Sequence, residues 1–301
     1  MEIFEWFKVV ILGIVEGITE WLPISSTGHL VLVGEVVKLD ASQSFIEMFN
    51  VVIQLGAILA VVVLYFKKLW PFHTRSHEPA RSWFANPAES GAAAAFQRFA
   101  NRHLYMDKIV MWLKIAVSCL PAIIIGLPLD DWVEEHMHRP VPIAAMLIIY
   151  GVLFIIIENY NRRRSPRITR ISQISWVDAL LIGIFQVLAI IPGTSRSGAT
   201  IVGGILIGMS RTLAAEYTFY LAVPTMLGAS AMKLVKFGLH FTAVEAATLI
   251  LGMAVAFLIS ILGIKFLMSY IKRHDFKVFG WYRIVLGALV LVLFAAGFLR
   301  G

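Results

Sequence analysis

The sequence predicts an all-α polytopic membrane protein, an inverted repeat of two halves, each a re-entrant helix hairpin plus three transmembrane helices. Three observations lead there. Only 15% of the 301 residues are charged and 59% are hydrophobic, whereas a soluble domain carries about 25% charged residues. The apolar residues form long runs, unlike the short alternating segments of an outer-membrane barrel. Finally, two stretches of the chain resemble each other at a separation of 170 residues.

The repeated stretches run from Ile11 to His29 and from Leu181 to Ala199. In each, an apolar helix stops at a proline, a hydroxyl-rich turn follows, and a shorter apolar piece resumes, at 30–37 and at 199–209. These pieces are too short for the roughly 20 residues that cross a bilayer. We therefore expect re-entrant hairpins at about 6–37 and 176–209, which are tolerated at membrane depth when surrounded by protein.

Six other apolar runs approach the length of a membrane span: 45–66, 108–127, 142–158, 212–232, 245–266 and 281–299. One hairpin and three spans then fall in each half, residues 1–158 and residues 159–301. An odd number of crossings inverts the second half relative to the first, as in inverted-repeat architectures. The simpler alternative is eight ordinary spans with a chance resemblance.

Lysine and arginine predict the orientation. They gather in 67–108, 158–175 and 265–280, which should be cytoplasmic, whereas the acidic loop 128–141 should be outside. Both termini are then outside, and the two hairpins enter from opposite faces. A polar stretch at 72–104 is expected to be a cytoplasmic loop insertion with room for a short surface helix.

The net charge of +7 lies mainly in these loops, so it indicates topology rather than nucleic-acid binding. Cys119 is the only cysteine, so no internal disulfide forms. Glu2 and Glu5 near the N-terminus argue against a cleavable signal peptide, and we expect the chain to remain in the membrane uncleaved.

The two copies differ in their charged residues. The first carries Glu16, Glu20 and His29, whereas the second carries Arg196. Charges inside a membrane are costly and usually functional. Glu16 and Glu20 are four residues apart, so they share a helix face and suit a divalent-metal site or an acid/base pair. The ordinary alternative is that both reach the outer interface. A neutral His29 suits general acid or base catalysis.

The turns Ser25–His29 and Thr194–Gly198 offer hydroxyls and helix N-termini, which favour phosphate. Arg196 adds a guanidinium suited to bidentate phosphate contact. Simple helix capping is the alternative for either turn alone. Together they predict one oxyanion site where the copies meet, with these phosphate-binding residues: Ser25, Thr27, Gly28, Ser195, Arg196, Ser197, Gly198 and Thr200.

Two further expectations concern structural residues. Arg211 and Glu216 begin the span after the second hairpin and are expected to pair near the cytoplasmic face. Four tryptophans near predicted span ends are expected to anchor the membrane interface: Trp21, Trp70, Trp132 and Trp281.

The motifs E-G-I-T-E-W-L-P-I-S-S-T-G-H and P-G-T-S-R-S-G-A-T closely resemble the two signature regions of the bacitracin-resistance type of undecaprenyl-diphosphate phosphatase. The resemblance covers nearly the whole chain and departs mainly at the polar insertion. It implies hydrolysis of undecaprenyl diphosphate to undecaprenyl phosphate, the lipid carrier of cell-wall synthesis, and bacitracin resistance. It also implies a plasma-membrane protein that requires a divalent cation and has an active site open to the periplasmic face. Dimers are known in that family.

The family's catalytic residues fall on Glu16, Glu20, Ser26, His29 and Arg196. We expect Mg²⁺ or Ca²⁺ on Glu16 and Glu20, and the prenyl tail of the substrate in membrane lipid or between helices. The attacking group is either Ser26, assisted by His29, or a metal-bound water.

Three other functions were weighed. Type-2 lipid phosphatases need a histidine soon after their Ser-Arg pair, and none follows Ser195-Arg196 here. A transporter or flippase of a prenyl phosphate lipid also fits inverted repeats with broken helices. A structural scaffold leaves the charged residues of the hairpins without a purpose.

Overall fold

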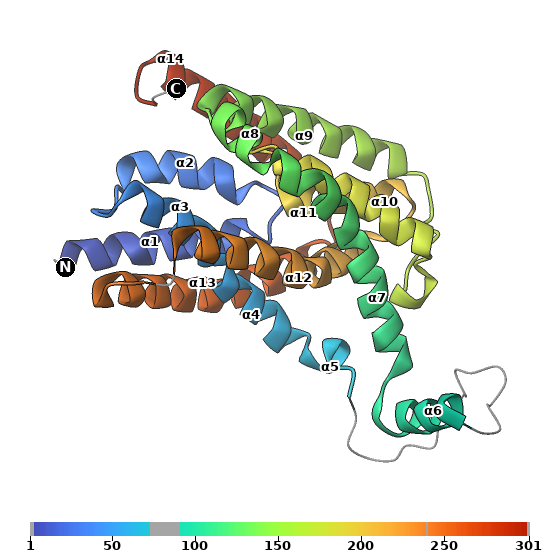
Figure 1. Cartoon of the computed structure of the whole chain (residues 1–301). Helices are drawn as coiled ribbons and strands as arrows, with labels where there is room; N and C mark the ends of the chain where they lie inside the picture. The colour runs from blue at the N-terminus through green and yellow to red at the C-terminus, as the bar shows by residue number, and fades with distance from the viewer. Residues whose placement is uncertain (1–2, 73–90, 239, 300–301) are drawn as a thin grey trace.

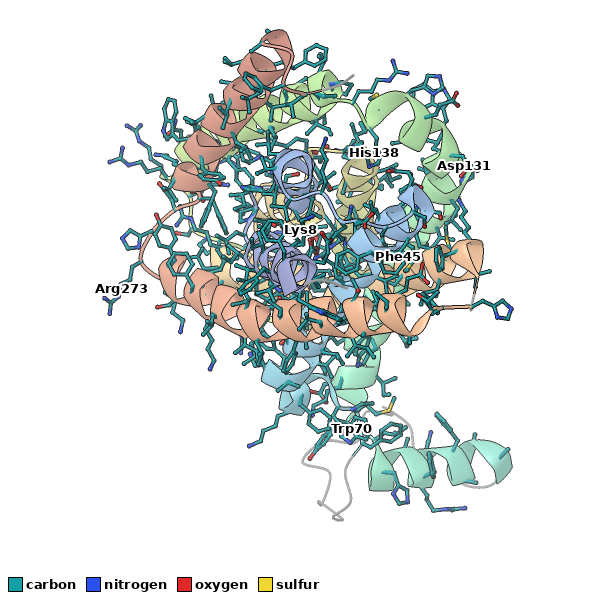
Figure 2. The ribbon with its side chains drawn as sticks, turned by 90° about the vertical axis from the view of Figure 1, so that its left-hand side faces the viewer. Lys8, Phe45, Trp70, Asp131, His138 and Arg273 are labelled. Carbon is teal, nitrogen blue, oxygen red and sulfur yellow. The ribbon has the colours of Figure 1, made fainter. Side chains whose placement is uncertain are left out.

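The computed structural model describes residues 3–72, 91–238 and 240–299, and this part of the chain is helical without a strand. Much of the predicted insertion, 73–90, lies outside the described residues. Most of the rest forms α6 (Gly91–His103), in agreement with the short helix considered from the sequence. This helix lies away from the main bundle in both Figure 1 and Figure 2.

Within the described residues, six helices are long and apolar enough to cross a membrane, which confirms the six predicted spans. Two of these spans are interrupted. The first breaks at Ile53, between α3 and α4, and the second contains a π-helical turn after Pro121. The elements are α3 (Gln43–Val52) with α4 (Gln54–Leu64), α7 (Met106–Pro121) with η1 (Ala122–Gly126) and α8 (Leu127–Met137), α9 (Pro140–Asn161), α12 (Arg211–Phe237), α13 (Ala243–Tyr270) and α14 (Lys277–Ala295). Three short elements connect them: α5 (Phe66–Leu69), η2 (Ile171–Gln173) and η3 (Leu188–Ile190).

The repeated stretches form two helix pairs joined by turns. The first pair is α1 (Ile3–Thr19) and α2 (Ser26–Val36), and the second is α10 (Trp176–Val187) and α11 (Arg196–Leu206). Adding 170 to the bounds of α2 gives the bounds of α11. Below, the first turn means residues 20–25 and the second turn means residues 191–195. In Figure 1 the pairs approach from opposite sides, α1 and α2 from the left and α10 and α11 from the right.

Each helix pair packs mainly on the other half of the chain. Helix α1 lies against α13, and α10 lies against α7. The first spans of the two halves (α3–α4 and α12) also contact each other, as do the third spans (α9 and α14). In Figure 2, Lys8 of α1 lies near the centre of the bundle. These contacts between the two halves are compatible with the predicted inverted repeat. The boundary at residue 158, in the last turn of α9, stays a prediction.

Two glycines at equivalent repeat positions permit this close packing. A Cβ on Gly13 would lie 2.9 Å from the Cβ of Val255, and one on Gly183 would lie 2.4 Å from the carbonyl oxygen of Ser118. Small residues let membrane helices approach closely, and here they let α1 pack on α13 and α10 pack on α7.

The three basic segments lie at one end of the molecule. One cavity is lined by both Arg164 and Lys272, and another is lined by Lys67, Lys108 and Arg170. The segments predicted to be cytoplasmic therefore share a face, as the orientation prediction requires.

Two structural expectations were wrong. Arg211 and Glu216 do not pair with each other: Arg211 Nε donates to Glu158 at 2.9 Å, and Glu216 binds the ammonium of Lys68 at 2.7 Å. These partners come from other helices, so the spacing along α12 did not reveal them.

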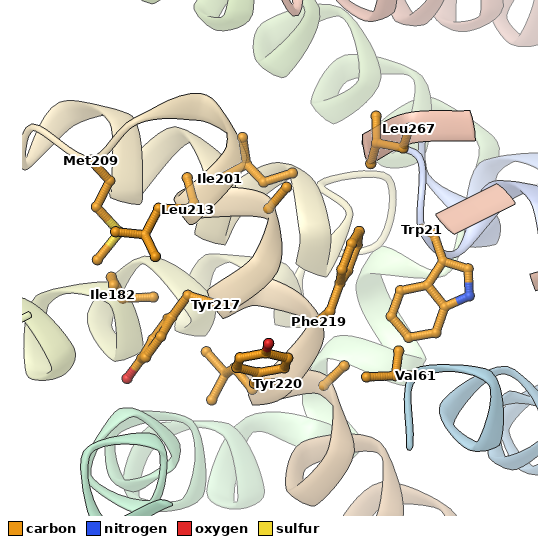
Figure 3. Close-up of a cluster of buried hydrophobic side chains, with 14 of the residues drawn as sticks. Trp21, Val61, Ile182, Ile201, Met209, Leu213, Tyr217, Phe219, Tyr220 and Leu267 are labelled. Atoms are coloured by element: carbon orange, nitrogen blue, oxygen red, sulfur yellow. The ribbon is translucent and has the colours of Figure 1, made fainter. Parts of the chain in front are cut away.

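Trp21 is not an interface anchor, because it is fully buried. Its indole packs edge-on against Phe219 of α12, with ring centroids 5.3 Å apart (Figure 3). The other three predicted anchors are about half exposed or more: Trp70, Trp132 and Trp281.

Candidate active site

Glu20, which follows α1, joins the two repeats. One carboxylate oxygen accepts a hydrogen bond from the Ser26 hydroxyl at 2.8 Å, and the other accepts one from Arg196 Nη2 at 3.0 Å. The Glu20 side chain is 8% exposed and that of Arg196 is 11% exposed, so the ion pair is largely shielded from water. The predicted convergence of opposite charges from the two copies is therefore present.

Arg196 is oriented by α12 as well as by Glu20. Its Nη1 donates to the carbonyl of Thr218 at 3.1 Å, and its guanidinium carbon lies 5.9 Å from the centre of the Trp21 ring. The Nε atom is buried and has no hydrogen-bond partner among the described residues. A rigid guanidinium with donor capacity to spare can bind an oxyanion bidentately.

Two serines with strained backbones begin the returning helices. Ser25 and Ser195 have φ angles of 74° and 71°, and they are the non-glycine residues with positive φ in the described chain. Each hydroxyl caps its helix by accepting a hydrogen bond from the amide of Gly28 or Gly198, at 3.3 and 3.2 Å. Such strain persists where surrounding structure enforces it, often at functional sites.

This capping revises part of the phosphate-binding prediction. The amides of Gly28 and Gly198 are occupied by the serine caps, so they are not free for a ligand. The amides of Ser26 and Thr27, which precede the first intrahelical bond of α2, remain suited to an anion. Gly198 instead makes room, since a Cβ there would lie 3.2 Å from Arg283 Nη1.

Ser197 and Thr200 were also predicted to hold phosphate, but both are buried and use their hydroxyls internally. Ser197 Oγ donates to the carbonyl of Glu20 at 3.2 Å, which fixes α11 to the first turn. Thr200 Oγ1 donates to the carbonyl of Arg196 at 2.9 Å and lies 2.8 Å from the Thr218 hydroxyl. The two residues therefore position the site rather than face a ligand.

Glu16 is fully buried one helical turn before Glu20, and neither of its carboxylate oxygens has a hydrogen-bond partner among the described residues. An isolated buried carboxylate is costly, so a cation or a proton is needed to neutralise it. Carboxylate oxygens are the ligands that Mg²⁺ and Ca²⁺ prefer. The orphaned carboxylate thus fits the predicted cation, although no group of three His, Cys, Asp or Glu residues gathers in the described structure.

Among the described residues, His29 and Ser26 form no hydrogen bond with each other, and the assistance of Ser26 by His29 stays a prediction. Its Nδ1 lies 2.7 Å from the carbonyl oxygen of Ser25, and its Nε2 lies 2.6 Å from the Tyr282 hydroxyl. A carbonyl only accepts, so in the neutral ring Nδ1 carries the proton and Nε2 accepts from the phenol. The two rings also stack, with an interplanar angle of 7°. The side chain that accepts a hydrogen bond from the Ser26 hydroxyl is Glu20 rather than His29.

Arg283 of α14 joins the two turns, and the sequence analysis missed it. It is fully buried; its Nη1 donates to the carbonyl of Pro23 at 3.1 Å, and its Nη2 donates to Gly193 and Thr194 at 2.7 and 2.8 Å. One guanidinium thus holds both turns by their backbones. The signal was present in the sequence, because Arg283 lies inside the apolar run 281–299.

The predicted catalytic residues therefore come together where the turns meet. The side chains that are partly exposed belong to these residues: Ser26, Thr27, His29, Ser195 and Arg196. The other predicted site residues are buried.

Comparison with known proteins agrees with this arrangement. The model of the family "Bacitracin resistance protein BacA" matches residues 9–289. A protein of Enterococcus faecalis named undecaprenyl-diphosphatase is 57% identical, over 98% of this chain and 99% of its own. Relatives in Desulfitobacterium hafniense (55%) and Clostridium acetobutylicum (54%), which carry the names undecaprenyl-diphosphatase and undecaprenyl-diphosphatase 1, are also covered at 98% or more of both chains. The chain belongs to the BacA family, whose members are multi-pass membrane proteins.

Proposed function

We propose that this protein hydrolyses undecaprenyl diphosphate to undecaprenyl phosphate and inorganic phosphate. The observation that carries the proposal is the position of Glu20, which contacts both the Ser26 hydroxyl and the Arg196 guanidinium. The proposed base, Glu20, thus contacts both the proposed nucleophile, Ser26, and the proposed phosphate-binding side chain, Arg196. The names of its close relatives describe the same reaction.

In the proposed first step, Ser26 Oγ attacks the terminal phosphorus of the diphosphate. A bond forms between that oxygen and phosphorus, the bond from phosphorus to the bridging oxygen breaks, and undecaprenyl phosphate leaves with the electron pair. Glu20 takes the hydroxyl proton. Water then attacks the phosphoserine: a bond forms between the water oxygen and phosphorus, and the bond from phosphorus to Ser26 Oγ breaks. Glu20 returns its proton to Oγ as inorganic phosphate leaves, which restores Ser26. Glu20 is poised for both steps because it already accepts a hydrogen bond from Ser26.

Arg196 supplies electrostatic stabilisation in this scheme. In the structure it pairs with Glu20, so an incoming phosphate competes with Glu20 for the guanidinium. As Arg196 shifts toward the phosphate oxygens, Glu20 loses its counter-charge and becomes a better base for Ser26. The amides of Ser26 and Thr27 at the start of α2 add positive potential at the same point.

Glu16, with Glu20 beside it, would hold the divalent cation. When bound, Mg²⁺ or Ca²⁺ supplies neutralisation of the diphosphate charge. His29 donates from Nδ1 to the carbonyl of Ser25 and keeps Nε2 toward Tyr282, so it acts as acid or base only when that phenol is displaced.

The proposed location is the bacterial plasma membrane, with the active site open to the outer face. The basic segments at one end of the molecule support this orientation, because such segments favour the cytoplasm. The first helix pair would then enter from the opposite, outer side.

A trapping experiment tests the nucleophile. Purified protein is mixed with undecaprenyl diphosphate radiolabelled on its terminal phosphate and quenched in acid, where phosphoserine survives. We expect label on the peptide that contains Ser26 and none in Ser26→Ala. The control Ser42→Ala, which loses only the helix cap of α3, should retain the label. Label-free peptide together with full turnover in Ser26→Ala would assign the attack to water instead.

Transport of a prenyl phosphate lipid stays a prediction. Release of phosphate by protein in detergent micelles, where no two compartments exist, separates hydrolysis from transport. Absence of release under these conditions would contradict the proposed phosphatase activity. A homodimer likewise stays a prediction, since the structure contains one chain.

A further inference from the structure

A cavity of about 520 Å³ at the basic end of the molecule has no assigned role. Its volume lies in the range of about 300–1,000 Å³ that is usual for small-molecule sites. It is formed by α5, α7, η2 and α12, and no residue of the two turns lines it. Five cationic side chains and two carboxylates line it: Lys67, Lys68, Lys108, Lys114 and Arg170, with Asp107 and Glu216. The lining therefore carries an excess of positive charge.

The deepest of these cations is Lys114. It is only 9% exposed and lies eight residues after the start of α7, which at 1.5 Å per residue is about 12 Å along a membrane-spanning helix. Its ammonium lies 5.7 Å from the centre of the Trp176 ring. Within the described chain, no carboxylate or carbonyl accepts a hydrogen bond or forms an ion pair with it.

The neighbouring lysines differ from Lys114 in this respect. Lys68 pairs with Glu216 at 2.7 Å, and Lys108 donates to the carbonyl oxygen of Lys67 at 2.7 Å. A charge inside a membrane-spanning segment normally has a partner or faces a functional cavity. Lys114 faces a cavity, and no described residue provides it with an anionic partner, so the missing charge is expected to come from a ligand.

We propose that this cavity binds a phosphate-bearing anion, with Lys114 as its innermost contact and Lys67 and Arg170 nearer the rim. Phosphate is the favoured chemistry because it accepts hydrogen bonds from several ammonium and guanidinium groups at once. Its source is either the headgroup of an anionic membrane phospholipid or free inorganic phosphate. One wall of the cavity, made by Val110, Met111 and Leu213, is apolar and suits the first carbons of a lipid.

The test measures binding with Arg196→Ala present in every protein, so that the Arg196 guanidinium does not contribute to anion binding. Protein purified in a neutral detergent is titrated in a calorimeter with inorganic phosphate and, separately, with dioctanoyl phosphatidylglycerol. Dioctanoyl phosphatidylcholine, a lipid without net charge, is the control for binding that does not depend on negative charge. We expect at least one anionic probe to bind, and Lys114→Met to weaken that probe by about tenfold or more, the effect of losing a charged hydrogen bond.

Lys265→Met is the matched control, because Lys265 is an exposed lysine of α13 that does not line this cavity. It should leave binding unchanged. Binding of phosphate alone would identify free phosphate as the ligand, and binding of the anionic lipid alone would identify a headgroup. Equal affinities with and without Lys114, or no binding of either anionic probe, would overturn the proposal.

Lys114→Met should fold, since it keeps the length of the side chain and removes a charge from a largely buried residue. With Arg196 intact, it should hydrolyse undecaprenyl diphosphate within twofold of the parent and unfold at the same or a higher temperature. A fall in unfolding temperature without ligand would show that Lys114 supports the fold instead, and would contradict a ligand-binding role.

Discussion

Glu16 and Glu20 lie one helical turn apart, yet their carboxylates have different surroundings. Glu20 has two partners of opposite character, a hydroxyl and a guanidinium, whereas Glu16 has none among the described residues. The sequence predicted the pair but could not assign separate roles. That division depends on α1 ending at Thr19, because Glu20 then lies in the turn and reaches the second repeat.

Replacing each carboxylate by its amide should separate these roles. Glu20→Gln removes the proposed base and should lower kcat by about 10²–10⁴-fold even at saturating cation. Glu16→Gln should instead raise the Mg²⁺ or Ca²⁺ concentration for half-maximal activity by about tenfold or more. Phosphate release measured across a cation titration distinguishes the two. Identical titration curves for Glu16→Gln and the parent would remove Glu16 from the cation site.

Arg283 shows how a residue distant in sequence can determine the site. Arg283→Met leaves three buried carbonyl groups without a donor, each at a cost of about 1–3 kcal/mol, partly offset by removal of a buried charge. We expect lower stability against denaturing detergent, and a fall in kcat larger than any change in KM. Arg283→Lys should recover part of both, because an ammonium can reach fewer of the three carbonyls. Unchanged stability and turnover in the methionine variant would show that the turns hold together without it.

At the scale of helices, the two serine caps combine a hydrogen bond with backbone strain. Ser25 has a φ of 74°, whereas Ser42, the cap of α3, has an ordinary φ of −62° and the same kind of bond, to the amide of Phe45. The chain therefore contains its own reference for the energetic cost of the strained conformation.

Ser42→Ala should lose only a cap, about 1 kcal/mol. Ser25→Ala should lose a similar amount, because the parent serine already carries the strain of the left-handed backbone, roughly 1–2 kcal/mol, and alanine keeps it. Ser25→Gly also loses the cap but removes the strain, since glycine has no Cβ. In unfolding by denaturing detergent, Ser25→Gly should therefore be more stable than Ser25→Ala, and the two alanine variants should lose similar amounts. A glycine at 25 that is no more stable than an alanine there would show that the backbone at this position is not strained.

Helix pairs and spans were predictable because they follow from apolar length and prolines. The partners of buried polar groups were not, since they come from elements far apart in the chain. Ser197 was predicted to face phosphate from its place in the motif, but α11 packs so closely on the first turn that its hydroxyl binds the Glu20 carbonyl. Tyr282 carried no sequence signal at all, because a tyrosine near the start of a span is ordinary.

For the whole molecule, orientation is the main prediction that the structure leaves to experiment. Cys119 is the only cysteine, so Cys119→Ser gives a background without thiols. Adding Asp131→Cys or Arg170→Cys places one exposed thiol in the acidic or in a basic segment. A membrane-impermeant maleimide on intact cells should label only the cysteine at 131, and both after permeabilisation, while the parent stays unlabelled. Labelling of the cysteine at 170 in intact cells would reverse the proposed topology.

The exchange of helices between the halves has a consequence for the covalent chain. Helix α1 packs on α13, α10 packs on α7, and α9 packs on α14, so most helix contacts join one half of the chain to the other. The halves therefore do not depend on the covalent linker at 162–175 to stay together. A protease cut within that linker would produce two fragments that remain assembled, and co-expressed halves of the gene would be able to complement each other.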